Sequence, residues 1–213
     1  MNNIKLKVCG MRDPSNIMEV SQLQPDYMGF IFYEKTPRYV GVDFFIPEHF
    51  PPATKRVGVF VNESSEVILE KVSAFKLDLV QLHGHEPAAQ CSELKDQGVG
   101  VIKVFSVGDN MDFRVTEAYG PAVDYFLFDT KGRFYGGNAE VFDWNVLARY
   151  DQKIPFFLSG GITPENVKGI GGFRSLNIQG IDVNSGVELS PALKDVEKIR
   201  AIKSILNAKL RDQ

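Results

Sequence analysis

Short runs of β-branched and aromatic residues recur along the chain at intervals of roughly 20 to 30 residues. Most of them are followed by a segment long enough for a helix. Strands and helices that alternate in this way are typical of parallel βα units, and eight units close a barrel. A doubly wound sheet would need only about five or six strands. We therefore predict the α/β class, with a (β/α)8 barrel that forms one domain over residues 1–213. The eight runs occupy residues 4–9, 26–32, 55–61, 78–83, 99–105, 123–129, 154–160 and 178–186.

The segments between these runs differ in how clearly they predict helices. Residues 13–23 begin with Asp13, which can cap a helix, and Pro14, which suits the first helical turn. Apolar residues at helical spacing predict helices over 64–75 and 195–210, and residues 163–167 repeat the capping pattern. Residues 45–53 and 106–120 carry only weak helical signals. A helix in either of these is expected from the repeat alone.

Net charge and composition limit the kinds of partner that the protein can bind and the cellular compartment in which we expect it. A net charge of -3 leaves no basic surplus for holding a nucleic-acid backbone, so we expect no nucleic-acid partner. We expect no membrane segment and no secretory signal, because no run of about 18 apolar residues occurs and the first residues are too polar. Two cysteines, Cys9 and Cys91, lie far apart without metal-binding spacing. We therefore predict a cytoplasmic protein with reduced thiols.

In a barrel of this kind, chemistry is carried at the ends of the strands, where the βα loops begin. The seventh run ends in Gly160 and is followed by Gly161, and the eighth ends in Ser185 and Gly186. Small residues let backbone N–H groups approach an anion, and the loops after strands seven and eight frequently bind phosphate. We therefore predict a phosphate site on these four residues and a phosphorylated small molecule as the ligand. For each pair taken alone, an ordinary turn is the simpler alternative.

Two further strand ends carry groups that can transfer protons. Asp129 follows an apolar run, where a desolvated carboxyl retains its proton and can act as an acid. Cys9 ends the first run, and alternation along the strand places Lys7 on the same face, where its charge favours a thiolate base. The structural alternatives are a buried, inert thiol for Cys9 and a turn-capping carboxylate for Asp129.

Two other residues are candidates for contacts with a ligand. Arg38, between Pro37 and Tyr39, can present its guanidinium to a carboxylate, although an exposed arginine is more often a solvated charge. His83 can be a ligand or a general base, or simply a hydrogen-bonded structural residue. No acidic residues accompany it at metal-binding spacing, so we expect no metal site.

In chain order, eight motifs resemble the phosphoribosylanthranilate isomerases of tryptophan biosynthesis. The resemblance runs essentially from end to end, and its combination of motifs is more specific than a generic phosphate-binding barrel. These motifs are KVCGMRDPSNI, GFIFYEKTPRYVG, VGVFVN, VQLHGHE, FLFDT, GG..EVFDW, LSGGITPENV and GIDVNSGVE.

The resemblance implies a cofactor-free Amadori rearrangement of N-(5-phosphoribosyl)anthranilate to 1-(2-carboxyphenylamino)-1-deoxyribulose 5-phosphate. The family's general base matches Cys9 and its general acid matches Asp129. Arg38 matches the arginine that engages the anthranilate moiety, and Asp182 matches an aspartate of the active-site wall. With His83, Arg38 and Asp182 form the predicted substrate-binding set, and the enzyme is expected to be a monomer or a homodimer.

The sequence departs from the family pattern at two places. Asn138 and Ala139 stand where Thr-Gly is common, and Asn184 stands where Ser is common. Both departures bear on loop closure and affinity, and neither changes the acid or the base. Two other readings stay open at this stage. A metal-dependent phosphopentose epimerase would need paired histidines and aspartates at strand ends. A non-catalytic sugar-phosphate-binding barrel could dispense with Cys9 and Asp129.

Overall fold

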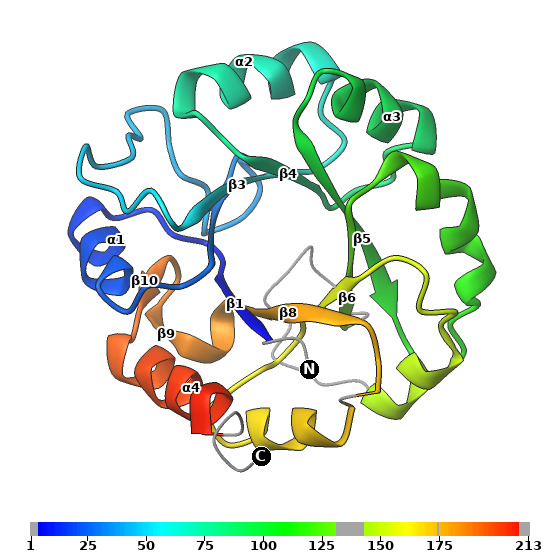
Figure 1. The fold of residues 1–213 in the computed structure, drawn as a ribbon. Helices are drawn as coiled ribbons and strands as arrows, with labels where there is room; N and C mark the ends of the chain where they lie inside the picture. The colour runs from blue at the N-terminus through cyan, green and yellow to red at the C-terminus, as the bar shows by residue number, and fades with distance from the viewer. Residues whose placement is uncertain (1–3, 131–142, 174, 209–213) are drawn as a thin grey trace.

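Eight parallel strands close into a barrel (Figure 1). The computed structural model describes residues 4–130, 143–173 and 175–208. Each strand pairs with its neighbours in sequence, and the first pairs with the eighth, so the sheet has no open edge. The predicted (β/α)8 barrel is confirmed, and each of the eight predicted runs overlaps one strand, although β5 and β6 extend past the ends of their runs. The strands are β1 (Lys5–Val8), β2 (Tyr27–Ile31), β3 (Lys55–Phe60), β4 (Leu79–Leu82), β5 (Gly100–Val107), β6 (Tyr125–Thr130), β7 (Phe156–Leu158) and β8 (Ile178–Val183).

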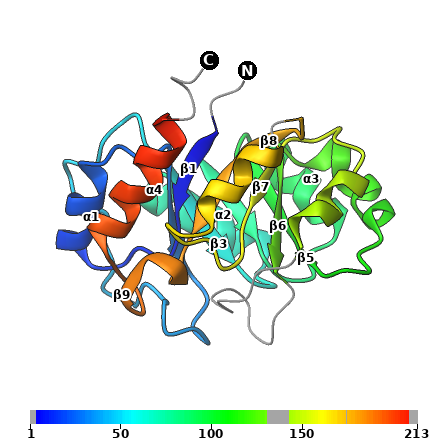
Figure 2. The ribbon, with the colours of Figure 1, turned by 90° about the horizontal axis from the view of Figure 1, so that it is seen from below.

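Helices surround the barrel, and the first and last α-helices pack side by side (Figure 2). The predicted Asp13 cap forms, since its side chain accepts from Asn16 N at 2.9 Å. In α2 the Ser64 side chain caps the helix by accepting from Val67 N at 3.4 Å, a contact that the sequence analysis did not predict. All the helices in the described residues are too short or too polar to span a membrane. The α-helices are α1 (Pro14–Ser21), α2 (Ser65–Phe75), α3 (Ala88–Asp96) and α4 (Val196–Ala208).

Several connections are not α-helical. Residues 32–54, between β2 and β3, form turns and irregular structure, because the prolines in this segment lack the N–H groups that a helix needs. The weak signal at 106–120 corresponds to a 3₁₀ helix, η1 (Phe113–Ala122), with a proline inside it. The capping pattern at 163–167 leads into another, η3 (Val167–Phe173), whose glycines disfavour an α-helix. The remaining 3₁₀ helices in the described residues are η2 (Trp144–Arg149) and η4 (Ser185–Val187).

The connection after β8 contains an element that the sequence pattern did not predict. η4 is followed by a short antiparallel hairpin of β9 (Glu188–Ser190) and β10 (Leu193–Lys194) before α4 begins. The hairpin is anchored to α1, since the Asn16 side chain bonds both the N–H and the carbonyl of Lys194, at 2.8 and 3.0 Å. Two charged side chains of the hairpin are thereby fixed beside the barrel mouth.

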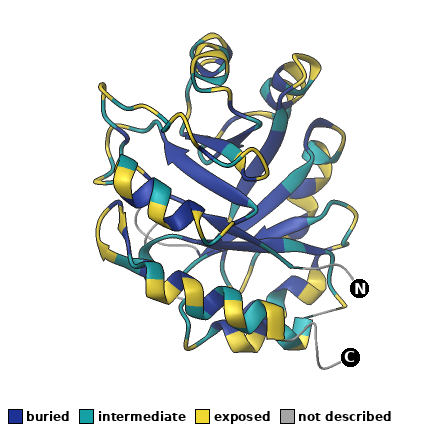
Figure 3. Cartoon of the chain, turned by 60° about the vertical axis from the view of Figure 1, so that its left-hand side comes forward, coloured by how far each residue is buried: buried dark blue, intermediate teal, exposed yellow. Residues whose placement is uncertain are grey.

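The strands are buried on both faces, whereas the helices are exposed on their outer sides (Figure 3). A large apolar cluster lies between the sheet and the helices. Inside the barrel, a second cluster fills the part near the strand starts. Toward the strand ends the interior becomes polar, and Cys9, Ile31 and Val59 form a small third cluster there. An apolar plug therefore closes the bottom of the barrel and leaves the polar side chains at its C-terminal mouth. The second cluster comprises Tyr27, Val57, Leu79, Ile102, Val104, Leu127 and Phe157.

The seam between β1 and β8 closes the barrel and depends on a glycine. Gly180 pairs with Lys5, and a Cβ at Gly180 would lie 2.5 Å from the Lys5 carbonyl oxygen. A side chain at this position would force the two strands apart.

We expect Gly180→Ala to lower the free energy of unfolding by about 1 to 3 kcal/mol, the usual cost of overpacking. Urea unfolding measures the change. Gly172→Ala is the matched control, since a Cβ there meets nothing within 4 Å. The seam argument fails if the two variants unfold at the same urea concentration.

Candidate active site

A pocket opens at the C-terminal mouth of the barrel. Its lining residues lie at the ends of β1, β2, β3, β4, β6, β7 and β8 or in the loops that follow them. Every residue singled out from the sequence as catalytic, substrate-binding or phosphate-binding lies in its wall. These are Cys9, Arg38, His83, Asp129, Gly160, Gly161, Asp182, Ser185 and Gly186.

A buried ion pair forms the floor of this pocket. The Lys7 Nζ atom lies 2.7 Å from Asp182 Oδ1, and the two residues occupy opposite positions in the β1–β8 register. Ser159 Oγ donates to the other Asp182 oxygen at 3.1 Å. Burial alone would lower the pKa of Lys7, but Asp182 and Cys9 outweigh this effect and raise it, so Lys7 is a cation.

Cys9 lies directly above this pair. Its backbone N–H donates to the Val183 carbonyl at 2.9 Å, which extends the β1–β8 pairing by one residue. Gly29 in β2 makes room for the thiol, since a Cβ at Gly29 would lie 2.7 Å from Cys9 Sγ. Burial raises the pKa of the Cys9 thiol, Asp182 adds to this effect, and the Lys7 and Lys194 ammonium groups oppose it. Lys7 acts in the predicted direction, but burial outweighs it, and Cys9 is a neutral thiol in the unliganded protein.

Asp129 lies at the end of β6, which is separated from β1 and Cys9 by β7 and β8 in the barrel. One of its oxygens accepts from Thr130 N at 2.9 Å, and the other lies 3.5 Å from His83 Nε2. The opposite ring nitrogen of His83 lies 3.3 Å from Gln81 Nε2. The structure therefore brings the predicted acid and the predicted histidine into direct contact.

Gln81 was not singled out by the sequence analysis. It lies in β4 two residues before His83, so the alternation of the strand directs both side chains into the barrel. Among the residues that the structure describes, Gln81 Oε1 is a buried oxygen without a hydrogen-bond partner. A buried acceptor of this kind, in the wall of a pocket, suits a hydroxyl group of a ligand.

A second buried ion pair, also missed from the sequence, fixes the loop that carries His83. Lys103 Nζ lies 2.7 Å from Glu86 Oε2 and donates to the Gly84 carbonyl at 2.8 Å. Glu86 in turn accepts from Gly84 N and Asn62 N. Burial raises the pKa of Glu86, but Lys103 and the backbone N–H of Asn62 outweigh this effect and lower it, so the carboxylate is charged. In the sequence, the only indication of this ion pair was the period-two alternation of β5, which places Lys103 on a buried face.

The two loops predicted to hold phosphate come together at one side of the pocket. Gly160 and Gly161 have φ of +94° and +60°, and a Cβ on Gly160 would overlap Thr130. A Cβ on Gly186 would overlap the Ile162 carbonyl. Glycine is required at both positions because the backbones of adjacent βα loops approach each other so closely.

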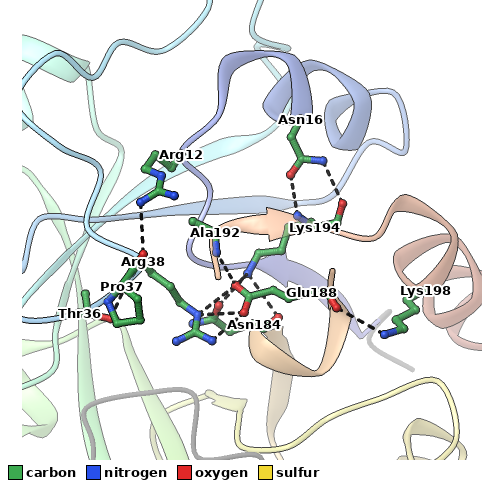
Figure 4. A network of polar contacts seen from close by, with 10 residues as sticks. All are labelled: Arg12, Asn16, Thr36, Pro37, Arg38, Asn184, Glu188, Ala192, Lys194 and Lys198. Atoms are coloured by element: carbon green, nitrogen blue, oxygen red, sulfur yellow. Dashed lines mark hydrogen bonds and ion pairs between the residues drawn. The ribbon is translucent and has the colours of Figure 1, made fainter. Parts of the chain in front are cut away.

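Arg38 is held by a carboxylate from the hairpin after β8 (Figure 4). Its guanidinium binds both oxygens of Glu188, with Nη2 to Oε2 at 2.6 Å and Nε to Oε1 at 3.0 Å. Lys194 Nζ binds the same carboxylate at 2.7 Å and Asn184 Oδ1 at 2.7 Å. The departure at Asn184 thus supplies a partner to a buried lysine. The other departure, Asn138-Ala139, lies outside the described residues. None of the described residues form a cluster of three or more His, Cys, Asp or Glu side chains suited to a metal ion.

Residues 6–204 match the family model described as N-(5'phosphoribosyl)anthranilate (PRA) isomerase. The chain is 46% identical over 198 residues to the N-(5'-phosphoribosyl)anthranilate isomerase of Parabacteroides distasonis, covering 92% of this chain and 90% of that protein. It is 46% identical over 206 residues to the one of Phocaeicola vulgatus, covering 97% of this chain and 99% of that protein.

Solved structures agree with this similarity. One is a phosphoribosyl anthranilate isomerase in complex with reduced 1-(o-carboxyphenylamino)-1-deoxyribulose 5-phosphate. It superposes with a TM-score of 0.79 at 33% identity, covering 97% of this chain and 98% of that one.

The direction of the Cys9 pKa predicts how its reactivity depends on pH. Iodoacetamide reacts with the thiolate, so the alkylation rate should rise with pH to a midpoint above the ordinary thiol value of about 8.5. We propose to measure it in a Cys91→Ser background, because burial raises the pKa of Cys91 to about 11 and its reaction would overlap. The Cys9→Ser/Cys91→Ser variant gives the background rate. A rate that reaches its plateau by pH 8 would contradict the account of Cys9.

Proposed function

The chain belongs to the N-(5'-phosphoribosyl)anthranilate isomerase family, and on this premise we propose how its pocket carries out the reaction. The protein is an aldose–ketose isomerase of tryptophan biosynthesis. It converts N-(5-phosphoribosyl)anthranilate to 1-(2-carboxyphenylamino)-1-deoxyribulose 5-phosphate. The observation that carries the residue assignment is that Cys9 and Asp129 lie in the wall of one pocket, at the ends of non-adjacent strands.

Asp129 acts as the general acid at the start of the reaction. It donates its proton to the ribose ring oxygen, the bond from that oxygen to C1 breaks, and a Schiff base forms between C1 and the anthranilate nitrogen. His83, 3.5 Å from the carboxyl, orients it toward the pocket. Gln81 supports His83 from the other side and offers its free oxygen to a hydroxyl of the substrate.

Cys9 acts as the general base in the second step. As a thiolate it removes the proton from C2, which gives an enolamine that tautomerises to the ketone. Because burial raises its pKa, only a small part of Cys9 is ionised at neutral pH, but that thiolate is a stronger base. Lys7 stabilises the thiolate, and Asp182 keeps Lys7 in place.

The ends of the substrate fix it between these two groups. Gly160, Gly161, Ser185 and Gly186 bind the phosphate mainly through backbone N–H groups, and Arg38 binds the anthranilate carboxylate. Binding at both ends holds the reacting carbons between acid and base. The solved relative with a bound reduced product analogue supports this assignment of substrate.

Three properties of the whole protein are part of the same proposal. We propose that it acts in the cytoplasm, that residues 1–213 form a single domain, and that it is a monomer or a homodimer. The small phosphorylated substrate is the partner that its pocket fits.

Replacing either proton-transfer group should remove most of the turnover. We expect Cys9→Ser and Asp129→Asn each to reduce kcat by about 10²- to 10⁴-fold, the usual contribution of a general acid or base. Both variants should still fold and bind the reduced product analogue. The decay of anthranilate fluorescence with freshly prepared substrate measures turnover. Cys91→Ser, which changes a buried thiol in α3, is the control and should retain activity. Near-normal turnover in Cys9→Ser would remove Cys9 as the base.

Removal of metal ions should leave turnover unchanged. The acid and base side chains supply both proton transfers, so the proposed mechanism contains no step for a metal. Dialysis against EDTA, followed by the fluorescence assay, tests this expectation. Inactivation that added divalent metal reverses would favour the metal-dependent epimerase reading instead.

A further inference from the structure

We propose that Glu188 is a positioning residue that sets the guanidinium of Arg38 for the substrate carboxylate and so determines the preference for an anthranilate moiety. The inference rests on the proposed function of Arg38 and extends it to a residue outside the predicted set. Glu188 comes from β9, in the hairpin after β8, whereas Arg38 comes from the segment after β2. The two side chains meet across the barrel mouth (Figure 4).

The contact between them is side-on and leaves part of Arg38 available. Glu188 binds the Nε and Nη2 edge of the guanidinium, with all three N–O distances between 2.6 and 3.1 Å. Nη1 does not take part in this pair. A guanidinium can serve one carboxylate with one edge and a second with another, because its N–H groups point outward in a fixed plane. Glu188 therefore selects which edge faces the pocket.

Glu188 is itself held too firmly to be displaced by a ligand. The Oε1 atom accepts from Lys194 Nζ at 2.7 Å and from Ala192 N at 3.1 Å, in addition to Arg38. Burial raises the pKa of Glu188, but hydrogen bonds and charge from Arg38 and Lys194 outweigh it, and the carboxylate stays ionised. The Asn16 contacts that anchor Lys194 extend this support to α1.

The backbone of Arg38 is fixed as well. Val40 N donates to the Ile31 carbonyl at 3.0 Å, which attaches the segment to the end of β2. Arg12 Nη1 donates to the Pro37 and Tyr39 carbonyls on either side, at 3.2 and 3.4 Å. With its backbone held at both sides and one edge clamped, Arg38 has one direction left for its free edge.

The pair of Arg38 and Glu188, which we call the clamp, lies next to the reacting groups. Gly10, directly after Cys9, has φ of +74°, and a Cβ there would lie 2.7 Å from Asn184 Oδ1, 3.2 Å from Arg38 Cδ and 3.3 Å from Lys194 Nζ. Arg38, Asn184 and Lys194 thus converge over the residue that follows the base. A carboxylate on Arg38 therefore lies close to Cys9, as an aromatic amine attached to C1 requires.

The charges give the clamp a second effect. Burial lowers the pKa of Lys194, and Glu188 opposes that effect. The pair of Arg38 with Glu188 carries no net charge, because the carboxylate neutralises the guanidinium. Without Glu188 the local charge would be more positive, and a simple electrostatic effect would strengthen carboxylate binding. If Glu188 positions Arg38, its loss weakens that binding instead. The two effects have opposite signs, which makes the proposal testable.

The test compares two ligands that differ only in the carboxylate: reduced 1-(o-carboxyphenylamino)-1-deoxyribulose 5-phosphate and its 1-phenylamino counterpart. Binding is measured by calorimetry with the full chain. We expect Glu188→Gln to weaken the binding of the carboxylated ligand about 10- to 100-fold. The affinity for the ligand without the carboxylate should change less than twofold. In turnover the variant should show a raised KM with little change in kcat. Glu197→Gln is the matched control, because this carboxylate is exposed on α4 and pairs only at the surface with Arg200.

Arg38→Lys supplies a variant that keeps Glu188 and the positive charge but cannot form the side-on fork. Arg38→Lys should reduce the preference for the carboxylated ligand as much as Glu188→Gln does. The double variant should reduce this preference little further, as expected for residues that act as one unit. Tighter binding of the carboxylated ligand to Glu188→Gln would overturn the proposal, and so would equal weakening of both ligands or full discrimination in Arg38→Lys. If wild type turns over the substrate without discriminating the ligands, the role of Arg38 fails while the isomerase function stands.

Discussion

The buried ion pair between Lys7 and Asp182 is the contact on which the rest of the site depends. It joins the first strand to the last, at the seam where the barrel closes, and it lies beneath Cys9, the proposed base. Removing one partner of such a pair leaves an unpaired buried charge and costs about 3 to 5 kcal/mol, whereas the intact pair contributes little net stability. The pair therefore serves this protein by positioning neighbouring groups and by supplying charge. It fixes Cys9 relative to β8 and supplies the cation that a thiolate needs.

A second constraint gives different surroundings to the two side chains proposed to transfer protons. Cys9 is buried beside two lysines, whereas Asp129 contacts His83 at the end of β6. Burial keeps the thiol protonated until the base is needed, and the cations make its ionisation accessible. The apolar plug below the site isolates these charges from water on the other side of the barrel. One pocket can thus hold an acid and a base with different surroundings, as an isomerisation requires.

The sequence predicts the barrel and the principal groups because both follow from local rules. Period-two alternation and the strand-end rule are enough to bring Cys9 and Asp129 into one pocket. Three other features lie beyond those rules. The segment 32–54 lacks a helix because its prolines override the repeat. The ion pair of Lys103 with Glu86 depends on how the loop after β4 lies against β5. Glu188 lies 150 residues from Arg38, and only the closed fold brings the two together, so no spacing in the sequence reveals the clamp.

A crystal structure of the enzyme with the reduced aminodeoxyribulose phosphate bound would test the central claim most directly. The account predicts the phosphate on the loops after β7 and β8 and the carboxylate on the free edge of Arg38, with Glu188 still in place. It predicts that Cys9 Sγ faces C2 and that the Asp129 carboxyl faces the oxygen derived from the ribose ring. A ligand bound in the opposite orientation, or with C2 out of reach of Cys9, would contradict the assignment of acid and base.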